Sequence, residues 1–322
     1  MKDISLRLKE FERANGLEGA LVECVPNFSE GRRKEAIDAI AASIEAVEGA
    51  NLLHVTSDHD HNRTVVTLAG SPAAVAEAAL CAMARAKDLI DLRAHRGEHP
   101  RIGATDVVPF VPVSGITLEG CAKLAWLVGE LAWERLGIPV YFYEGAARMP
   151  ERKNLADIRK GEFEGLSAEV RTNPDRRPDV GGPMLHESAG ATVIGARKFL
   201  VAYNVNLRTE DITVARKIAR AIREKDGGLP GVKALGFMIE EKKMAQVSMN
   251  LVDCDVTPPL KAIQAIRAEA ARYGVELAEG ELIGIIPLKY LMATAAEALM
   301  LPSLGEDQVL EALVWKKGKD GR

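Results

Sequence analysis

Apolar and polar residues alternate between strand-like and helix-like spacing along the first half of the chain. Residues 20–27 form a short apolar run that predicts a strand, and apolar residues then recur every three or four positions from Ile37 to Val47, which predicts a helix. Two strand-like runs follow at 52–56 and 63–68, and Ser71 is placed to cap a second helix. The pattern therefore predicts the order strand, helix, strand, strand, helix.

The same order returns in the second half of the chain. The first copy continues as a strand, a helix and a strand at 107–113, 117–136 and 139–143. The second copy reads as strand, helix, hairpin, helix and extended segments at 198–206, 210–225, 232–251, 258–273 and 275–286. This recurrence predicts an α/β (α+β) fold of two ferredoxin-like βαββαβ plait subdomains, with antiparallel-rich sheets backed by helices.

A polar segment separates the two copies. Residues 149–183 are rich in Arg, Pro, Asp and Gly, which is typical of a linker and surface loop. We therefore expect an N-terminal subdomain at 1–180, a C-terminal subdomain at 181–302 and a frayed tail at 303–322. Ligands often bind where domains meet, so this linker marks the first place to look for a site.

Composition narrows the class of protein. The 322 residues are 47% hydrophobic and 27% charged, with a formal net charge of -4, as expected of a globular chain of about two domains. This charge predicts no general attraction to nucleic acid. No apolar run reaches 18 residues, so no membrane span is expected. The four cysteines lie in separate segments without C-x-x-C spacing, which favours a reduced, cytoplasmic location.

The loop at 91–106 concentrates side chains that can do chemistry. His99 can take and return a proton near neutral pH, and Arg93, Arg96 and Arg101 can bind carboxylates as planar forks. Pro100 and nearby glycines break the preceding helix, so these side chains are expected on a loop held by rigid elements. The alternative is a solvated charged loop whose histidines bond only to backbone.

A second polar cluster lies in the predicted hairpin at 58–63. Asp58, His61, Asn62 and Arg63 are candidates for contacts with a polar ligand. His59 and His61 alternate along the chain and, with His95, raise a metal site as an alternative. Asp and Asn also favour hairpin turns for backbone reasons alone, so the spacing is weak evidence for a metal.

The third candidate is the glycine-rich run from Gly181 to Gly190. Its glycines allow close approach to a flat ligand, but the composition equally fits an interdomain hinge. The run does not form G-x-G-x-x-G between a strand and a helix, so no dinucleotide site is predicted. Neither a P-loop nor a G-x-S-x-G motif occurs in the chain, which argues against a P-loop nucleotidase and an α/β-hydrolase.

Several longer motifs together resemble the glutamate formimidoyltransferase family. They occur in the family's order at 21–31, 62–65, 97–103, 146–149, 190–199, 246–251 and 286–289. Relatives in vertebrates carry a cyclodeaminase domain after this one. The chain ends too early to hold that domain, so the resemblance implies a stand-alone transferase.

The resemblance implies an enzyme of histidine degradation that works on small molecules. The family transfers the formimino group of N-formimino-L-glutamate to N5 of tetrahydrofolate and releases L-glutamate. Tetrahydrofolate is then a substrate, no metal is expected, and the protein is expected to be a homodimer with the ligand between two α/β subdomains. Nucleic acid and membranes are not expected partners.

The resemblance also implies roles for individual residues. The family's catalytic histidine lies in its Gly-Glu-His-Pro-Arg motif, which assigns general base and acid catalysis to His99. Two segments match the folate-contacting parts of the family, and they comprise Gly181, Gly182, Pro183, Met184, Leu185, His186, Glu187, Ser188, Ala189 and Gly190, then Pro287, Leu288, Lys289, Tyr290, Leu291, Met292, Ala293, Thr294 and Ala295. The first segment departs from the vertebrate pattern at His186-Glu187 and at Ala189.

Three other functions remain open at this point. The same scaffold could transfer a formyl group, as a glutamate N-formyltransferase or another enzyme acting on 5-formyltetrahydrofolate. A metal-dependent hydrolase could use His59, His61 and His95. A folate carrier without catalysis is the third alternative.

Overall fold

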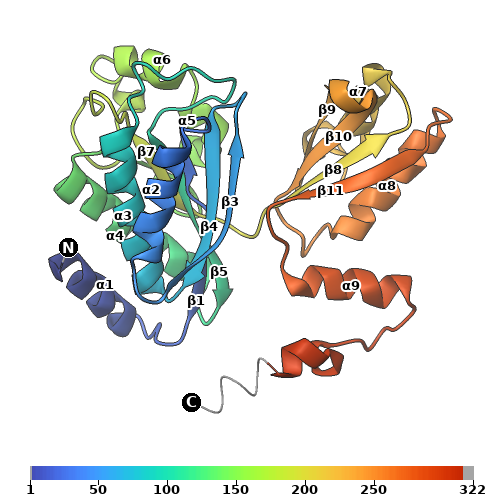
Figure 1. Cartoon of the computed structure of the whole chain (residues 1–322), viewed down its shortest axis with the longest axis horizontal. Coiled ribbons are helices and arrows are strands. Elements are labelled where there is room, and N and C mark those ends of the chain that lie inside the picture. The colour runs from blue at the N-terminus through green and yellow to red at the C-terminus, as the bar shows by residue number, and fades with distance from the viewer. Residues whose placement is uncertain (1, 315–322) are drawn as a thin grey trace. The chain divides into compact units, whose positions relative to one another are not determined.

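The computed structural model of the chain describes residues 2–314. It has two compact units that divide between Lys198 and Phe199. Each unit contains one β-sheet backed by helices, and together they make a mixed α/β protein with one seven-stranded and one four-stranded sheet (Figure 1).

The first unit contains most of the secondary structure. Its strands are β1 (Leu21–Cys24), β2 (Asn27–Phe28), β3 (Ala50–Asp58), β4 (Arg63–Gly70), β5 (Thr105–Ser114), β6 (Val140–Glu144) and β7 (Thr192–Ala196). Its helices are α1 (Lys2–Ala14), α2 (Lys34–Glu45), α3 (Pro72–Leu89), α4 (Leu118–Leu136), α5 (Leu155–Ile158) and α6 (Glu162–Glu169), with 3-10 turns η1 (Pro150–Arg152) and η2 (Pro174–Arg176).

The seven-stranded sheet combines an antiparallel part with a parallel extension. Its order is β1-β4-β2-β5-β7-β6, with β3 on the outer side of β4. Strands β1 and β2 both pair with β4 and with β5, and Pro26 lies in the gap between them, where a residue without an N–H does not extend a ladder. Strand β7 pairs in parallel with β5 and with β6.

Apolar residues cover both faces of this sheet. On one face, α2, α3 and α4 pack over a large core that includes Phe28, Phe110 and Phe142, each fully buried (Figure 1). On the other face, α5 and α6 add Ile158 and Leu166 to a smaller core with Val107, Tyr141, Tyr143 and Val193. Part of the second face, next to β2 and β4, carries polar side chains instead.

The second unit has a simpler sheet. Its elements are β8 (Val201–Leu207), α7 (Ile212–Ile222), η3 (Glu224–Asp226), β9 (Val232–Ile239), η4 (Glu240–Lys242), β10 (Met244–Leu251), α8 (Pro259–Ala271), β11 (Leu277–Ile283) and α9 (Leu288–Ala298), followed by η5 (Glu306–Gln308). The strand order is β11-β8-β10-β9, and every neighbouring pair is antiparallel. Helices α7 and α8 supply Ile218 and Ile266 to its core.

Most elements expected from the hydrophobic pattern are present, but residues 149–183 are not simply a linker and surface loop. They hold α5 and α6, where Phe163 and Leu166 are buried. Helix α1 and strand β7 were not expected either. Because β7 is the strand between β5 and β6, residues 181–198 belong to the first unit rather than to the start of the second.

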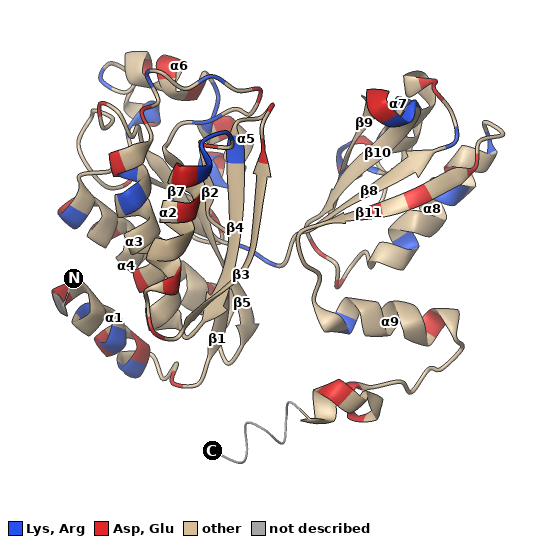
Figure 2. Ribbon diagram, viewed as in Figure 1, with Lys and Arg blue, Asp and Glu red and all other residues tan. Residues whose placement is uncertain are grey.

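The C-terminal segment has a helix at 310–314, and Ala312 within it is buried. The rest of the expected tail, residues 315–322, lies outside the described residues. Across residues 2–314, no helix combines the length and the apolar character that crossing a membrane requires. Figure 2 shows that charged residues of the first unit gather on the helices and on the loops near α5 and α6, while the strands are mostly uncharged.

Candidate active site

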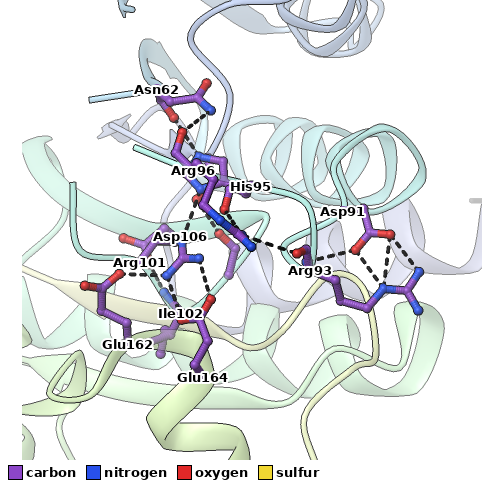
Figure 3. Close-up of polar contacts among 12 residues, drawn as sticks. Asn62, Asp91, Arg93, His95, Arg96, Arg101, Ile102, Asp106, Glu162 and Glu164 are labelled. Atoms are coloured by element: carbon purple, nitrogen blue, oxygen red, sulfur yellow. Dashed lines mark hydrogen bonds and ion pairs between the residues drawn. The ribbon is translucent and has the colours of Figure 1, made fainter. Parts of the chain in front are cut away.

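Asn62 joins three segments of the first unit. It lies in the tight turn between β3 and β4 with a left-handed φ of 49°. Its side-chain Oδ1 accepts from the backbone N–H of Gly31 at 2.8 Å, and its Nδ2 donates to the carbonyl of Arg96 at 2.9 Å. Its own carbonyl accepts from His95 Nε2 at 3.0 Å. The turn, the segment before α2 and the loop after α3 are therefore held together at one buried residue (Figure 3).

Arg101 anchors the other end of that loop. Its side chain is 6% exposed and donates to Glu162 at 2.7 Å and to both oxygens of Glu164 at 2.8 and 2.9 Å (Figure 3). Its Nε donates to His95 Nδ1 at 3.1 Å. Because these contacts occupy Arg101 with groups of the protein, they favour a role in holding the loop on α6 over the expected contact with a substrate.

His95 is a structural histidine in this arrangement. One ring nitrogen donates to Asn62 and the other accepts from Arg101, which sets the tautomer with the proton on Nε2. Burial lowers the pKa of His95, and the neighbouring Arg101 lowers it further. Neither ring nitrogen is left to bind a metal.

His99 lies between these two anchors and is held differently. Its Nε2 accepts from Arg63 Nη1 at 3.0 Å, so the neutral ring carries its proton on Nδ1. Burial is the largest cause that lowers the pKa of His99 from 6.5 to about 2, and the positive charges of Arg63 and Arg159 add to it. Residues 95–101 thus present an uncharged imidazole whose Nε2 lone pair faces a guanidinium.

Arg63 comes to His99 from the first residue of β4. The same Nη1 also donates to Asn27 Oδ1 at 3.2 Å. Asn27 pairs with Val65, while the next residues Phe28 and Val66 point into the core under the helices. Because side chains alternate along a strand, Asn27 and Arg63 project from the opposite face of the sheet. The strand pattern therefore places this polar cluster on the face that α2 and α3 leave open.

The first expected folate segment lies against the same loop. The backbone N–H of Leu92 donates to Ser188, and that of Ala104 donates to Ala189. At Gly103 a Cβ would overlap the carbonyl oxygen of Ala191, so only glycine fits there. His186 Nδ1 accepts from the backbone N–H of Ala189 at 3.1 Å, and burial lowers the pKa of His186. The structure thus brings residues 186–190 and the His99 loop together.

The remaining charged candidates lie closer to solvent. His61 Nδ1 is 3.0 Å from Asp58 Oδ2, and His61 is about half exposed. Arg93 is paired with Asp91 and, at 2.5 Å, with Glu187 of the first folate segment. Arg96 Nη1 donates to the carbonyl of His95 at 2.6 Å.

His59 is 76% exposed, and its Nδ1 is 3.5 Å from Asp60. Within residues 2–314, no three His, Cys, Asp or Glu side chains are grouped so that they could hold a metal ion. His59, His61 and His95 therefore do not form the three-ligand cluster on which the hydrolase alternative depended.

The second expected folate segment lies in the other unit, at the start of α9. Tyr290 is buried in the core of that unit, and its hydroxyl donates to Asp255 at 3.2 Å. Lys289 Nζ donates to the same carboxylate at 2.7 Å, and this hydrogen bond raises the pKa of Lys289. Leu291 is half exposed. These contacts attach α9 to the segment that precedes α8.

The reasoning from sequence did not single out three residues of this site. Asn27 positions Arg63, and Asp106 binds Arg159 and also accepts from the backbone N–H of Ile102 at 2.8 Å. Asn27 and Asp106 lie in segments that the sequence analysis did mark, at 21–31 and 91–106. Arg159 lies in the segment expected to be a linker, and no local pattern pointed to it.

The lowered histidine pKa values predict that acid destabilises the first unit from near neutrality. The unfolded chain binds protons as pH falls through about 6.5, whereas His99, His95 and His186 resist protonation when folded. The free energy of unfolding then falls with pH, and His99 contributes about 1–2 kcal/mol between pH 7 and pH 5.

Urea unfolding followed by fluorescence of Trp126 and Trp133, both on α4, measures this effect, ideally in a Trp315→Phe background. His99→Gln should reduce the loss between pH 7 and pH 5, while His59→Ala should not. An unchanged loss in His99→Gln would contradict the neutral, partly buried state of His99.

Comparison with known proteins identifies the class of this chain. Residues 21–197 match the model of the N-terminal subdomain of the formiminotransferase domain, and residues 202–306 match the model of the formiminotransferase domain. The chain belongs to the formiminotransferase family.

Its relatives include two enzymes of similar length. The chain is 44% identical over 293 residues to glutamate formimidoyltransferase of Thermoplasma acidophilum, covering 91% of this chain and 96% of that protein. It is 44% identical over 292 residues to glutamate formimidoyltransferase of Streptococcus pyogenes, covering 90% and 97%. Formimidoyltransferase-cyclodeaminase of Rattus norvegicus is also 44% identical, over 86% of this chain but only 52% of its own length.

Proposed function

We propose that this protein is a glutamate formimidoyltransferase, which moves the formimino group of N-formimino-L-glutamate to N5 of tetrahydrofolate in histidine degradation. The observation that carries the proposal is 44% identity to two glutamate formimidoyltransferases over nearly their whole length. Both substrates are small molecules, and tetrahydrofolate is consumed as the acceptor.

The reaction needs one proton to move between two nitrogens. N5 of tetrahydrofolate attacks the formimino carbon, and a tetrahedral adduct forms as N5 loses its proton. The bond between that carbon and the glutamate nitrogen then breaks as this nitrogen gains a proton, which leaves 5-formiminotetrahydrofolate and glutamate. A single base that accepts the first proton and donates it in the second step balances the reaction.

We assign this proton transfer to His99. Its neutral ring has a lone pair on Nε2, as a base requires, and the loop that carries it is held at both ends by Asn62 and Arg101. We assign the residues of Gly181–Gly190 and Pro287–Ala295 to folate binding because both match folate-contacting segments of the family. The first of these is bonded to the His99 loop.

Other properties of the protein stay proposals that rest on the family resemblance. These are a homodimer, a ferredoxin-like plait in each unit and a cytoplasmic location. The strand orders support the plait, since β3-β4-β1-β5 in the first unit corresponds to β9-β10-β8-β11 in the second. The free cysteines Cys24, Cys81, Cys121 and Cys254 fit a reducing compartment.

A paired assay tests the proposed activity and its formyl alternative. The purified protein is given tetrahydrofolate with either N-formiminoglutamate or N-formylglutamate, and glutamate release is measured. We expect release from the formimino donor and slower release from the formyl donor. Faster release from the formyl donor would assign a glutamate N-formyltransferase, and release from neither donor would overturn the proposal.

A further inference from the structure

Arg63 is partly buried, and its contacts differ from those of Arg101, Arg152 and Arg159 in the first unit. Arg101 binds Glu162 and Glu164, Arg152 is 2.7 Å from Asp179, and Arg159 binds Asp106. Within residues 2–314, no carboxylate lies within 4 Å of the Arg63 guanidinium, which instead donates to the neutral side chains of Asn27 and His99.

The side chain of Arg63 also has an unused hydrogen-bond donor. Its Nε is buried and has no hydrogen-bond partner. The Nε of Arg159 is in the same state, but Arg159 is also paired with Asp106. Burial lowers the pKa of Arg63 and the positive charge of Arg159 adds to this effect, while the carboxylates of Asp106 and Asp58 act in the opposite direction. A partly buried guanidinium with an unused donor on its planar fork is suited to bind a carboxylate in two parallel hydrogen bonds.

The Arg63 contact also conflicts with proton transfer by His99. The lone pair that His99 would use as a base accepts the hydrogen bond from Arg63. A general base works best when its pKa is near the operating pH, and the pKa of His99 is about 2 in this state. The arrangement therefore describes a resting state, in which Arg63 occupies the Nε2 lone pair of His99.

We propose that Arg63 binds the α-carboxylate of N-formiminoglutamate and thereby frees Nε2 of His99 for proton transfer. This inference rests on the proposed function. The α-carboxylate is attached to the carbon that carries the reacting nitrogen, so a group bound to it lies beside the nitrogen that His99 must protonate. The carboxylates of tetrahydrofolate lie far from N5, beyond the aminobenzoyl group.

The other charged groups around His99 leave this role to Arg63. Arg159, which follows α5, is already bound by Asp106 of β5. His61, in the turn before β4, contacts Asp58, and His95, on the same loop, bonds to Asn62 and Arg101. Arg63 is the cation facing His99 whose charge a substrate can neutralise, and an anion placed beside an imidazole raises its pKa.

Donor analogues with one carboxylate masked test the assignment. The α-amide of N-formiminoglutamate should react with a kcat/KM about 10- to 100-fold below that of the parent donor in the wild-type protein, because Arg63 then lacks its partner. In Arg63→Gln the parent donor should lose this advantage, so that both donors react at similar rates. Arg85→Gln, an exposed residue of α3, is the matched control and should discriminate like the wild type.

An unchanged ratio of the two donors in Arg63→Gln, in a protein that still releases glutamate, would overturn the inference while leaving the proposed function intact. If the wild-type protein released no glutamate from the parent donor, the proposed function itself would be overturned. If Arg63→Gln does not fold, Arg63→Lys keeps the charge without the fork and should retain only part of the discrimination.

NMR of histidine-labelled full-length protein reads the state of His99 directly. In the wild type, saturation with glutamate, which carries the same α-carboxylate, should raise the pKa of His99 by at least about one unit. The tautomer should be Nδ1–H before glutamate is added. Arg63→Gln should raise the pKa without glutamate and show no further response to it. An unchanged pKa of His99 at saturating glutamate in the wild type would contradict the proposal that the α-carboxylate replaces His99 as the partner of Arg63.

Discussion

Replacing His99 with Gln is expected to lower kcat about 10²- to 10⁴-fold, with tetrahydrofolate and N-formiminoglutamate as substrates. This range is the usual contribution of a positioned general acid and base, and the remaining rate comes from holding the two substrates in contact. Gln can accept a hydrogen bond from Arg63 in place of His99 but cannot carry a proton. The measurement is glutamate release at saturating concentrations of both substrates.

His59→Ala is the matched control for this experiment. His59 is a histidine of the same polar region, but its side chain is 76% exposed and makes one long contact with Asp60. Its kcat should stay close to that of the wild type. A kcat in His99→Gln within about threefold of the wild-type value would remove His99 from the chemistry, whatever the family of the protein.

Replacing Asn62 with Ala should destabilise the first unit by about 2–4 kcal/mol. The substitution leaves the part-buried N–H of Gly31 and carbonyl of Arg96 without their partners, and each lost hydrogen bond of this kind costs about 0.5–1.5 kcal/mol. It also places alanine, which disfavours the left-handed region more than asparagine does, at a φ of 49°. This adds roughly 1 kcal/mol to the loss of stability. Urea unfolding followed by the fluorescence of Trp126 and Trp133 on α4 measures this change in the free energy of unfolding.

Two further variants separate these contributions. Asn62→Gly loses the same hydrogen bonds but tolerates the left-handed φ, so it should be about 1 kcal/mol more stable than Asn62→Ala. Asn51→Ala, on the exposed strand β3, removes a single 3.2 Å bond to Ala69 and should change stability by less than about 0.5 kcal/mol. Equal stability of Asn62→Ala and the wild type would show that Asn62 does not join the segments.

Asn62→Ala should also lower kcat, because Asn62 holds the loop that positions His99. A loss of kcat without a change in the unfolding free energy would point to a direct contact of Asn62 with a substrate instead. The two readouts therefore distinguish a positioning residue from a binding residue.

The order of elements followed from the sequence wherever the hydrophobic period was clear. Ser71 accepts from the N–H of Ala74 at the start of α3, as the Ser-Pro pair predicts. The short strand β7 was missed, because a fully buried run of five residues that contains Gly195 has no alternation to mark it. Helix α6 was missed because only Phe163 and Leu166 in it are buried, and Gly161 and Gly165 suggested a loop.

The sequence by itself determined the order of most strands and helices, the family resemblance and the candidacy of His99. Only the tertiary structure decided which arginines are already paired with carboxylates. Arg63 and Arg101 are equally plausible anion ligands in the sequence, yet Arg101 meets carboxylates that lie 61 and 63 positions further along the chain. Periodicity reports on neighbours within a few residues, whereas the charge that an arginine has left to offer depends on partners that only folding brings within hydrogen-bond distance.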